Sequence, residues 1–367
     1  MDFSKIKAVE NGDLRVIEEL KQSDKQIYVY GCAAHAEMIC KYLTTSGLAV
    51  EGYLVDHCFY KEEFYIDGLK VYDIDDYIGQ LDDFNIVIGF CEINKTKFLM
   101  QNQQLLKGSY FLIWEHEIGY VWDEQYLTEN NEMLSAIYDE LADDKSRQVL
   151  RELAYSKVNH TNGKLLVIAD TNQYFNELTF EKDAAEEIFV DCGAFNGDTI
   201  QKYHQFTGGA YKRIYAFEPN QDNRTQLARN TINCHDVVVV PKGAWCEETV
   251  LRFDANGSNS CISEQGDNEI EVTSIDKIVG DDKVTFIKMD IEGSELEALK
   301  GAYVTIRNNM PKLAICCYHK ANDIIDLYTY IKTFDREDCT YSFFLRHHSN
   351  GAYETVLYAI PIMRNDR

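Results

Sequence analysis

The stretch IFVDCGAFNGDT, residues 188–199, decides the fold. Its apolar start, residues 188–190, is typical of a buried strand, and Asp191 follows at the C-terminal end of that strand. A turn with two glycines comes next, and a helix is expected to begin near residue 198. Open α/β sheets bind their ligands at this end of the strands, where the first N–H groups of the helix are free. The stretch therefore predicts a ligand-binding turn in an α/β fold.

The glycine spacing of this turn differs from two common nucleotide sites. Gly193 and Gly197 give the pattern Asp-x-Gly-x-x-x-Gly, which is not the Gly-x-Gly-x-x-Gly of dinucleotide-binding turns. The turn also lacks the Lys-Ser/Thr pair of a phosphate-binding loop. Both nucleotide sites are thus disfavoured at this position.

Two further strand ends carry carboxylates. The stretch IYAFEPN places Glu218 at the end of a second strand, 27 positions after Asp191, and FIKMDIEG places Asp290 at the end of another. A carboxylate at such a position can accept hydrogen bonds from both hydroxyls of a ribose. Several carboxylates at one sheet edge also favour a ligand with positive charge, such as a sulfonium or an amino group.

Strands and helices alternate through the whole C-terminal half. Strands are predicted at 187–192, 212–218, 236–240, 284–290 and 312–317, and helices at 197–205, 220–231, 294–301 and 322–332. The last two strands, 340–346 and 354–360, follow each other through Ser349-Asn350-Gly351 and predict an antiparallel hairpin that closes a mostly parallel sheet. Residues 251–272 interrupt the alternation and are either a loop over the site or an ordinary surface hairpin.

A smaller alternation precedes this one. Residues 1–22 read as helical; strands are predicted at 26–30, 49–55, 84–89 and 109–114, a helix at 33–43, and a hairpin around Asp67-Gly68. Residues 128–158 read as mostly helical. These patterns divide the chain into an N-terminal Rossmann-like α/β domain (1–125), a helical connector (126–172) and a larger C-terminal domain (173–367).

Residues 26–56 resemble a degraded dinucleotide fingerprint. Gly31, Ala33 and Ala36 occupy the three glycine places, and Asp56 follows Gly31 by 25 residues. A side chain at residue 33 would block the closest approach to a pyrophosphate. Recognition of a sugar-type substrate, a scaffold or oligomerisation role, and nicotinamide binding all stay open for this domain.

Composition narrows the classes of partner. The 367 residues include 61 acidic and 36 basic ones, a formal charge of −25, so nucleic acid and anionic membrane are not expected as partners. No apolar run approaches the ~20 residues of a membrane span, and the N-terminus lacks a signal pattern. We expect a soluble, cytoplasmic protein. Eleven cysteines without a Cys-x-x-Cys pair indicate reduced core thiols and no structural zinc site.

Four blocks together resemble the FkbM-type methyltransferases, class I enzymes that use S-adenosylmethionine. The blocks are VDCGAFNGDT (190–199), YAFEPN (215–220), TSIDKI (273–278) and FIKMDIEGSELEALKGA (286–302). Cys192, Phe195 and Asn220 depart from the family pattern. The resemblance implies a doubly wound, mostly parallel sheet with an antiparallel final strand, S-adenosylmethionine as cofactor and S-adenosylhomocysteine as product.

The resemblance also implies roles for individual residues. Asp191 and Gly193 would line the methionine part of the cofactor, Glu218 would bind its ribose, and Asp290 would lie near the sulfonium and the acceptor. Residues just beyond the third strand would lie near adenine; these are Gly243, Ala244 and Trp245. The other expected cofactor contacts are Ala194, Phe195, Asn196, Gly197, Asp198, Thr199, Pro219 and Asn220.

An alcohol acceptor must lose a proton during methyl transfer, which requires a base. The candidates are Asp290, Glu292 and His319, each at the same predicted sheet edge. A divalent ion held by the same three residues is an alternative, although no metal site is predicted. Two adjacent histidines after the sixth strand, His347 and His348, are candidate acceptor contacts. Lys288 is expected to pair with Asp290, two residues away on one face of the strand.

The leading hypothesis is O-methylation of a glycan or another small polyol. A homo-oligomer and a monomer both stay open. One alternative is a non-catalytic module that binds the cofactor or a nucleotide-sugar and acts through its N-terminal domain. A nicotinamide oxidoreductase that uses the Gly31 turn is another.

Overall fold

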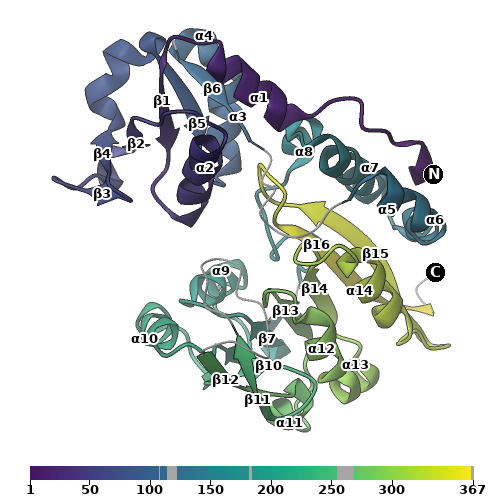
Figure 1. The fold of residues 1–367 in the computed structure, drawn as a ribbon. Helices are drawn as coiled ribbons and strands as arrows, with labels where there is room; N and C mark the ends of the chain where they lie inside the picture. Colours follow the sequence, from purple (N-terminus) through teal and green to yellow (C-terminus); the bar gives the residue numbers. More distant parts are fainter. Residues whose placement is uncertain (107, 114–121, 182–183, 254–267, 365–367) are drawn as a thin grey trace.

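The computed structural model describes residues 1–106, 108–113, 122–181, 184–253 and 268–364, and it contains two large sheets joined by helices (Figure 1). The N-terminal sheet has six strands in the order β3-β4-β2-β1-β5-β6. Its strands are β1 (Gln26–Tyr30), β2 (Gly52–Val55), β3 (Tyr65–Ile66), β4 (Leu69–Asp73), β5 (Phe84–Ile88) and β6 (Ser109–Phe111). Its helices are α1 (Gly12–Lys21), α2 (Ala34–Thr45), α3 (Ile93–Gln101) and α4 (Gln103–Leu106), with 3-10 turns η2 (His57–Phe59) and η3 (Ile74–Asp83).

The predicted strands of this sheet are present, although β2 and β6 are shorter than the predicted ranges 49–55 and 109–114. β1 pairs in parallel with β2 and β5, and only β3 runs antiparallel to its neighbour β4. The hairpin turn has the predicted residues, because Asp67 and Gly68 both have positive φ, 48° and 82°, as a two-residue turn with the twist of a hairpin requires.

The helix predicted over residues 1–22 is shorter than expected. A 3-10 turn, η1 (Phe3–Lys5), comes first, and α1 begins only at residue 12, capped by the side chain of Asn11, which accepts a hydrogen bond from the Leu14 N–H at 3.0 Å. The residues between are tied to another helix, since the Val9 N–H donates to Asn159 Oδ1 at 2.8 Å. Tertiary hydrogen bonds outside the segment thus replace the helical ones.

Four helices cover one end of the C-terminal sheet: α5 (Glu124–Glu129), α6 (Asn131–Glu140), α7 (Asp144–Asn159) and α8 (Gly163–Ile168). The apolar face of α7 is buried at Val149 and Leu153. Asp143 caps this helix and also accepts a bond from Arg346 Nη2 at 2.6 Å, which ties the helix to the last hairpin. The predicted helical connector is therefore packed against the second sheet.

The C-terminal sheet has seven strands in the order β15-β16-β14-β13-β7-β8-β9. Its strands are β7 (Ile188–Cys192), β8 (Arg213–Phe217), β9 (Val237–Val240), β13 (Phe286–Met289), β14 (Lys312–Cys316), β15 (Cys339–His347) and β16 (Thr355–Met363). The surrounding helices are α9 (Asp198–Phe206), α10 (Gln221–Asn230), α11 (Ile275–Val279), α12 (Glu295–Lys300), α13 (Tyr303–Asn309) and α14 (Asp323–Lys332), with the 3-10 turn η4 (Ala184–Glu186).

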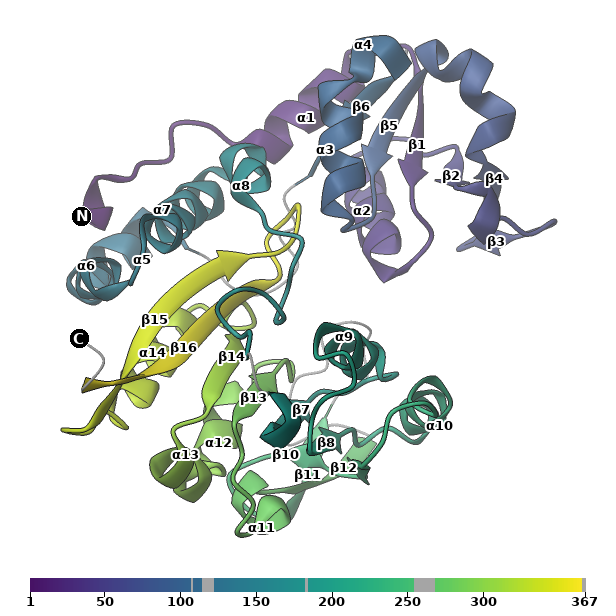
Figure 2. The same ribbon diagram turned by 180° about the vertical axis from the view of Figure 1, so that it is seen from behind.

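Only β16 runs against the other strands of this sheet, as predicted for the final hairpin. Because β16 is antiparallel, its first residue lies at the edge where the parallel strands β7, β8, β13 and β14 end. Figure 2 shows the tip of the β15–β16 hairpin reaching past α8 toward the N-terminal sheet. Asn350, in this tip, donates to the Phe90 carbonyl at 2.7 Å.

The insert between β9 and β13 forms a small separate sheet. It contains β10 (Gly243–Ala244), β11 (Thr249–Phe253) and β12 (Asn268–Thr273), and β11 pairs antiparallel with β12. The hairpin expectation for residues 251–272 is confirmed for its two strands, whereas residues 254–267 lie outside the described part of the chain.

Ten cysteines in the described ranges are free thiols, in keeping with the predicted reduced state. Among the helices of those ranges, none is both long and apolar enough to cross a membrane.

Candidate active site

A buried ion pair closes the end of β7. Asp191 Oδ1 lies 3.0 Å from Lys288 Nζ on β13, and neither side chain exceeds 2% exposure. The parallel register places these two residues directly opposite each other. The expected pair between Lys288 and Asp290 is therefore replaced, because Asp290 lies beyond the end of the strand and Lys288 meets its neighbour across the ladder.

Both members of this pair are charged at neutral pH. Burial raises the pKa of Asp191 to about 6, although Lys288 opposes that rise. Burial disfavours the charged form of Lys288, but the carboxylates of Asp191 and Asp290 raise its pKa above the ordinary value. The Lys288 ammonium also donates to the carbonyl of Gly193 at 2.9 Å, so one cation holds both the strand end and the turn that follows.

The turn after β7 needs glycine at its first glycine position. Gly193 has a φ of 85°, and a Cβ on it would lie only 2.0 Å from the carbonyl oxygen of Asp290. The N–H groups of Gly193 and Ala194 both donate to the Phe217 carbonyl of β8. The turn thus lies between the ends of β8 and β13, and the backbone at Gly193 packs closely against the backbone at Asp290.

Glu218 organises the same turn from the end of β8. Its carboxylate accepts hydrogen bonds from the Phe195 N–H at 3.0 Å and from the Asn220 N–H at 2.8 Å. Burial raises the pKa of Glu218. Phe195, at a φ of 45°, is about half exposed beside it. The departures from the family pattern at residues 195 and 220 therefore contribute backbone N–H donors, which any residue type but proline supplies.

Asp290 lies between two tyrosine hydroxyls. Tyr174 Oη donates to Asp290 Oδ2 at 3.0 Å, and Tyr318 Oη donates to Asp290 Oδ1 at 3.0 Å. Burial favours the neutral acid, but Lys288 and His319 lower the pKa of Asp290 below its ordinary value. Asp290 is therefore a fixed, ionised carboxylate at the end of β13.

His319 is held by acidic neighbours. Its Nδ1 lies 3.0 Å from Glu295 Oε1, and its Nε2 lies 3.5 Å from Asp290 Oδ1 and 3.7 Å from Glu292 Oε2. Burial alone would lower its pKa, but these carboxylates, Glu295 first, raise the pKa of His319 to about 9. An imidazolium has no lone pair for a proton or a metal ion. The raised pKa fits His319 to orient these carboxylates, and its expected role as a base stays a prediction.

Three residues that sequence reasoning did not assign to the site lie around Asp290. Tyr174 comes from the irregular segment after α8, Tyr318 is the second residue after β14, and Glu354 directly precedes β16. One carboxylate oxygen of Asp290, one of Glu354 and Cys316 Sγ lie within 4.8 Å of one another. The sequence could have indicated Tyr318 and Glu354 as site residues, since each lies close to a strand end at the predicted edge. No feature of the sequence marks Tyr174 in this way.

The two histidines predicted as candidate acceptor contacts form hydrogen bonds with residues of the fold. His347 Nδ1 lies 3.0 Å from Thr355 Oγ1, and His348 lies between the Asp170 carbonyl and Tyr358 Oη. Both histidines are buried and serve the hairpin.

The third motif block has a structural role as well. Asp276 accepts hydrogen bonds from the first N–H groups of α13. The fourth block needs Gly301 because a Cβ there would lie 1.9 Å from the Trp245 carbonyl oxygen. Trp245 in turn donates its N–H to the Thr273 carbonyl and extends the β10 pairing. Gly243, Ala244 and Trp245 thus follow β9 as expected, and their contact with adenine stays a prediction.

The N-terminal fingerprint has internal partners too. Asp56 accepts from Tyr30 Oη at 2.6 Å and from Lys95 Nζ at 2.5 Å. Gly31 is required by packing, since a Cβ there would lie 2.4 Å from the Gly89 carbonyl oxygen. The acidic residue that a nicotinamide site would offer to a ribose is therefore already engaged.

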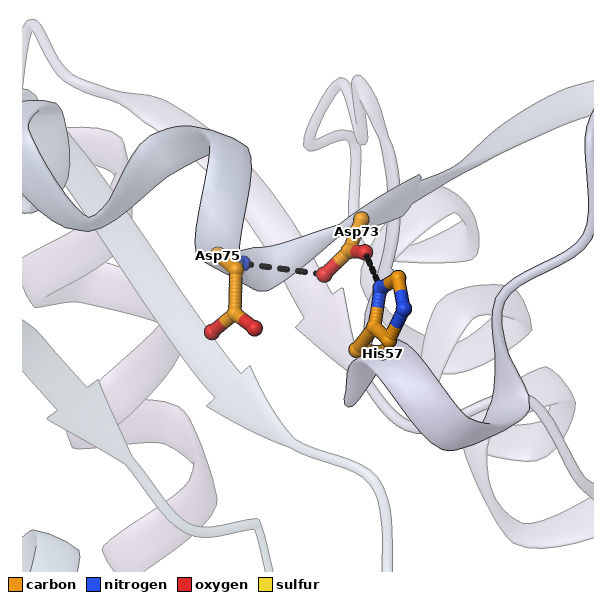
Figure 3. Close-up of side chains that lie close together, drawn as sticks. All are labelled: His57, Asp73 and Asp75. Atoms are coloured by element: carbon orange, nitrogen blue, oxygen red, sulfur yellow. Dashed lines mark hydrogen bonds and ion pairs between the residues drawn. The ribbon is translucent and has the colours of Figure 1, made fainter.

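A second acidic group lies on the same N-terminal sheet (Figure 3). His57 Nδ1 lies 2.6 Å from Asp73 Oδ2, and the Asp75 N–H donates to Asp73 Oδ1 at 3.0 Å. The second bond is an ordinary cap of η3. Each carboxylate oxygen of Asp73 therefore already has a partner within this segment.

The residues at the edge of the C-terminal sheet fit the expected cofactor. Asp191 Oδ2 is buried and has no hydrogen-bond partner among the described residues. The turn keeps glycine where the backbone must come close, and carboxylates dominate the charge around it. Such a site suits a ligand that combines hydroxyl groups, an amino group and a sulfonium.

Comparisons with known proteins find similarity to methyltransferases. Residues 191–343 match the model of the methyltransferase FkbM domain. The crystal structure of methyltransferase FkbM from Methylobacillus flagellatus KT has the same fold, with a TM-score of 0.65 and 23% identity over 95% of this chain and 94% of that one. The hexuronic acid methyltransferase AglP of Haloferax volcanii is 28% identical over 133 residues, 34% of this chain. That match spans 53% of the length of AglP. Residues 191–343 are thus similar to the methyltransferase FkbM domain, and the resemblance drawn from the four sequence blocks is confirmed.

Proposed function

We propose that this protein transfers the methyl group of S-adenosylmethionine to a hydroxyl oxygen of a sugar or another small polyol. The observation that carries the proposal is the convergence of Asp191, Glu218 and Asp290 at one edge of a sheet whose chain matches the FkbM domain. In this arrangement Asp191 and Gly193 would hold the amino acid end of the cofactor and Glu218 would hold its ribose.

When bound, S-adenosylmethionine supplies an electrophilic methyl group on a positively charged sulfur. The chain itself contributes position and charge. Asp290, kept ionised and oriented by two tyrosine hydroxyls, presents a negative oxygen toward that edge. Orientation of two reactants in one site accounts for much of the rate of such a displacement, with effective molarities of ~10⁵ M or more.

A sugar acceptor is supported by the similarity to AglP, whose name specifies a hexuronic acid. A hexuronic acid offers both hydroxyl groups and a carboxylate for methylation. The ionised Asp290 and its acidic neighbours Glu292 and Glu295 repel a second carboxylate at close range. This repulsion favours a hydroxyl as the methylated group.

The test has two steps. Calorimetry with S-adenosylhomocysteine, NADH and a nucleotide-sugar should show binding of the adenosyl ligand by the wild type, with a loss of at least ~10-fold in affinity for Glu218→Gln. Exposed Glu132→Gln is the matched control.

Wild-type protein is then incubated with methyl-labelled S-adenosylmethionine and the methyl glycosides of glucose, glucuronic acid and galacturonic acid. Label that resists mild alkali marks a methyl ether, the expected product; label lost in alkali marks an ester and contradicts the hydroxyl assignment. Binding of NADH or a nucleotide-sugar without binding of the adenosyl ligand would refute the methyltransferase proposal.

A further inference from the structure

Glu354 carries a carboxylate at the edge of the C-terminal sheet where β13 and β14 end. It directly precedes β16, and the antiparallel direction of that strand brings its start to the ends of β13 and β14. A carboxylate oxygen of Glu354 lies within 4.8 Å of an Asp290 carboxylate oxygen and of Cys316 Sγ. Two carboxyl groups from different strands thus approach each other in a largely buried place.

The structure holds Glu354 in a defined position. Its backbone has a φ of 62°, a left-handed conformation that is uncommon for glutamate, and its carbonyl oxygen accepts the His348 N–H at 2.9 Å. Gln173 Nε2 donates to Glu354 Oε2. In the part of the chain that the structure describes, Oε1 accepts no hydrogen bond. Unusual backbone conformations that persist in a folded protein are concentrated at functional sites.

We propose that Glu354 is the general base that takes the proton of the acceptor hydroxyl, an inference that rests on the proposed function. As the acceptor oxygen forms its new bond to the methyl carbon, the carbon–sulfur bond breaks and its electron pair stays on sulfur. The O–H bond of the acceptor breaks at the same stage, and its proton passes to the free oxygen of Glu354. The products are a methyl ether, S-adenosylhomocysteine and a protonated Glu354, which later returns the proton to water.

The other candidate bases suit this step less well. Both oxygens of Asp290 already accept tyrosine hydroxyls, and its charge is stabilised. The carboxylates around His319 raise its pKa to about 9, which favours the imidazolium at neutral pH. The Glu292 side chain is 60% exposed, so water competes for it. Burial, and the nearby charge of Asp290, raise the pKa of Glu354 to about 7, which is where a general base works best near neutral pH.

The groups that face Glu354 come from several elements. Burial and the charge of Asp290 favour its protonated form, whereas the hydrogen bond from Gln173 and the charges of His319 and Lys288 favour its ionised form. The thiol of Cys316, also buried, adds no charge at neutral pH because burial raises its pKa well above the ordinary value. Since Asp290 and Glu354 are close, they titrate as a pair, and the proton of that pair resides mainly on Glu354.

The experiment compares proton release when the protein binds S-adenosylmethionine or S-adenosylhomocysteine, which differ by one methyl group and one positive charge. Calorimetry at pH 7 in buffers of different ionisation enthalpy gives the number of protons released. A base with a pKa of about 7 is half protonated there, and a sulfonium that lowers its pKa by ~1 unit leaves ~0.1 protonated. Wild type should therefore release ~0.4 proton more with S-adenosylmethionine than with S-adenosylhomocysteine.

In Glu354→Gln this difference should fall below ~0.1 proton, while the affinity for S-adenosylhomocysteine stays within threefold of wild type, which shows that the variant is folded. Exposed Glu132→Gln should release protons as wild type does. With any glycoside that the wild type methylates, Glu354→Gln should lower kcat by ~100-fold or more and leave KM unchanged.

An undiminished release in Glu354→Gln would overturn the base assignment and leave the methyltransferase proposal intact. A failure of wild type to bind either adenosyl ligand would instead refute the methyltransferase proposal, and the role of Glu354 with it.

Discussion

The buried pair of Asp191 and Lys288 makes a prediction that can be worked out in detail. Lys288→Met removes the only cation within hydrogen-bond distance of Asp191 in the described part of the chain, and Asp191 Oδ2 has no hydrogen-bond partner there. Removal of one partner from a buried ion pair costs about 3–5 kcal/mol, because the remaining charge is uncompensated. The Lys288 ammonium also leaves the Gly193 carbonyl, which adds to the loss.

The cost should depend on pH in a defined direction. Without the lysine, Asp191 folds as the neutral acid, with a pKa that can reach ~8–9 in a dry site, but it is ionised in the unfolded chain above ~4. The folded state then binds the extra proton, so the free energy of unfolding of the variant falls by ~1.4 kcal/mol for each pH unit up to the new pKa. Wild type, in which the pKa of Asp191 is about 6, shares this fall only below pH 6, so the deficit of the variant should be smaller at pH 5 than at pH 8.

Urea unfolding at pH 5, 6.5 and 8 measures the free energy of unfolding. Hydrogen exchange of peptides from β7 and β13 measures the local stability of the two strands that hold the pair. Adding Asp191→Asn to Lys288→Met should restore ~2 kcal/mol or more at pH 8 and remove the pH slope. The control is Lys202→Met, which breaks a 3.0 Å pair with Asp198 at the surface. That pair should matter by less than ~1 kcal/mol. If Lys288→Met costs no more than the surface control, or costs the same at pH 5 and pH 8, the reasoning is refuted.

Three further predictions follow from single contacts. Gly193→Ala should destabilise the fold by ~2 kcal/mol or more and abolish binding of S-adenosylhomocysteine, because its Cβ would lie 2.0 Å from a carbonyl oxygen. The control Gly208→Ala, also at positive φ but in open space, should cost only ~1–2 kcal/mol. Equal losses of the two variants in calorimetry and thermal melts would contradict this prediction. His319 should titrate near pH 9 by NMR and near or below its ordinary value in Glu295→Gln; its raised pKa stabilises the fold fully below pH ~6.5, and that stabilisation is lost as pH rises through about 9. Asn350→Ala removes bonds from the hairpin tip to the N-terminal sheet and should speed hydrogen exchange in α3 with ~1–3 kcal/mol less protection; unchanged exchange would show that the tip does not hold that sheet.

Much of the fold was accessible from residue patterns. Short apolar runs that end in Asp191, Glu218 and Asp290 marked three parallel strands, and the hairpin signal around residue 350 marked the antiparallel strand. These signals are local, because burial on both faces makes a parallel strand uniformly apolar and a polar residue then marks its end. The break before α1 was missed because Asn159, far along the chain, supplies its hydrogen bonds.

The site was only partly accessible in the same way. The sequence determined which carboxylates stand at the sheet edge, since strand order along the chain and the parallel direction decide that. How these groups pair depends on the folded chain: Lys288 meets Asp191 across the ladder, Asp290 lies between two tyrosines, and His319 lies among three carboxylates.

The physical reason is the range of the interactions involved. Residue type and period along one strand determine burial and direction, and both can be read within a few positions. Charge state and hydrogen bonding depend on neighbours within a few ångströms, and Tyr174 and Glu354, which face Asp290 from segments 116 and 64 residues away, enter that range only when the chain is folded.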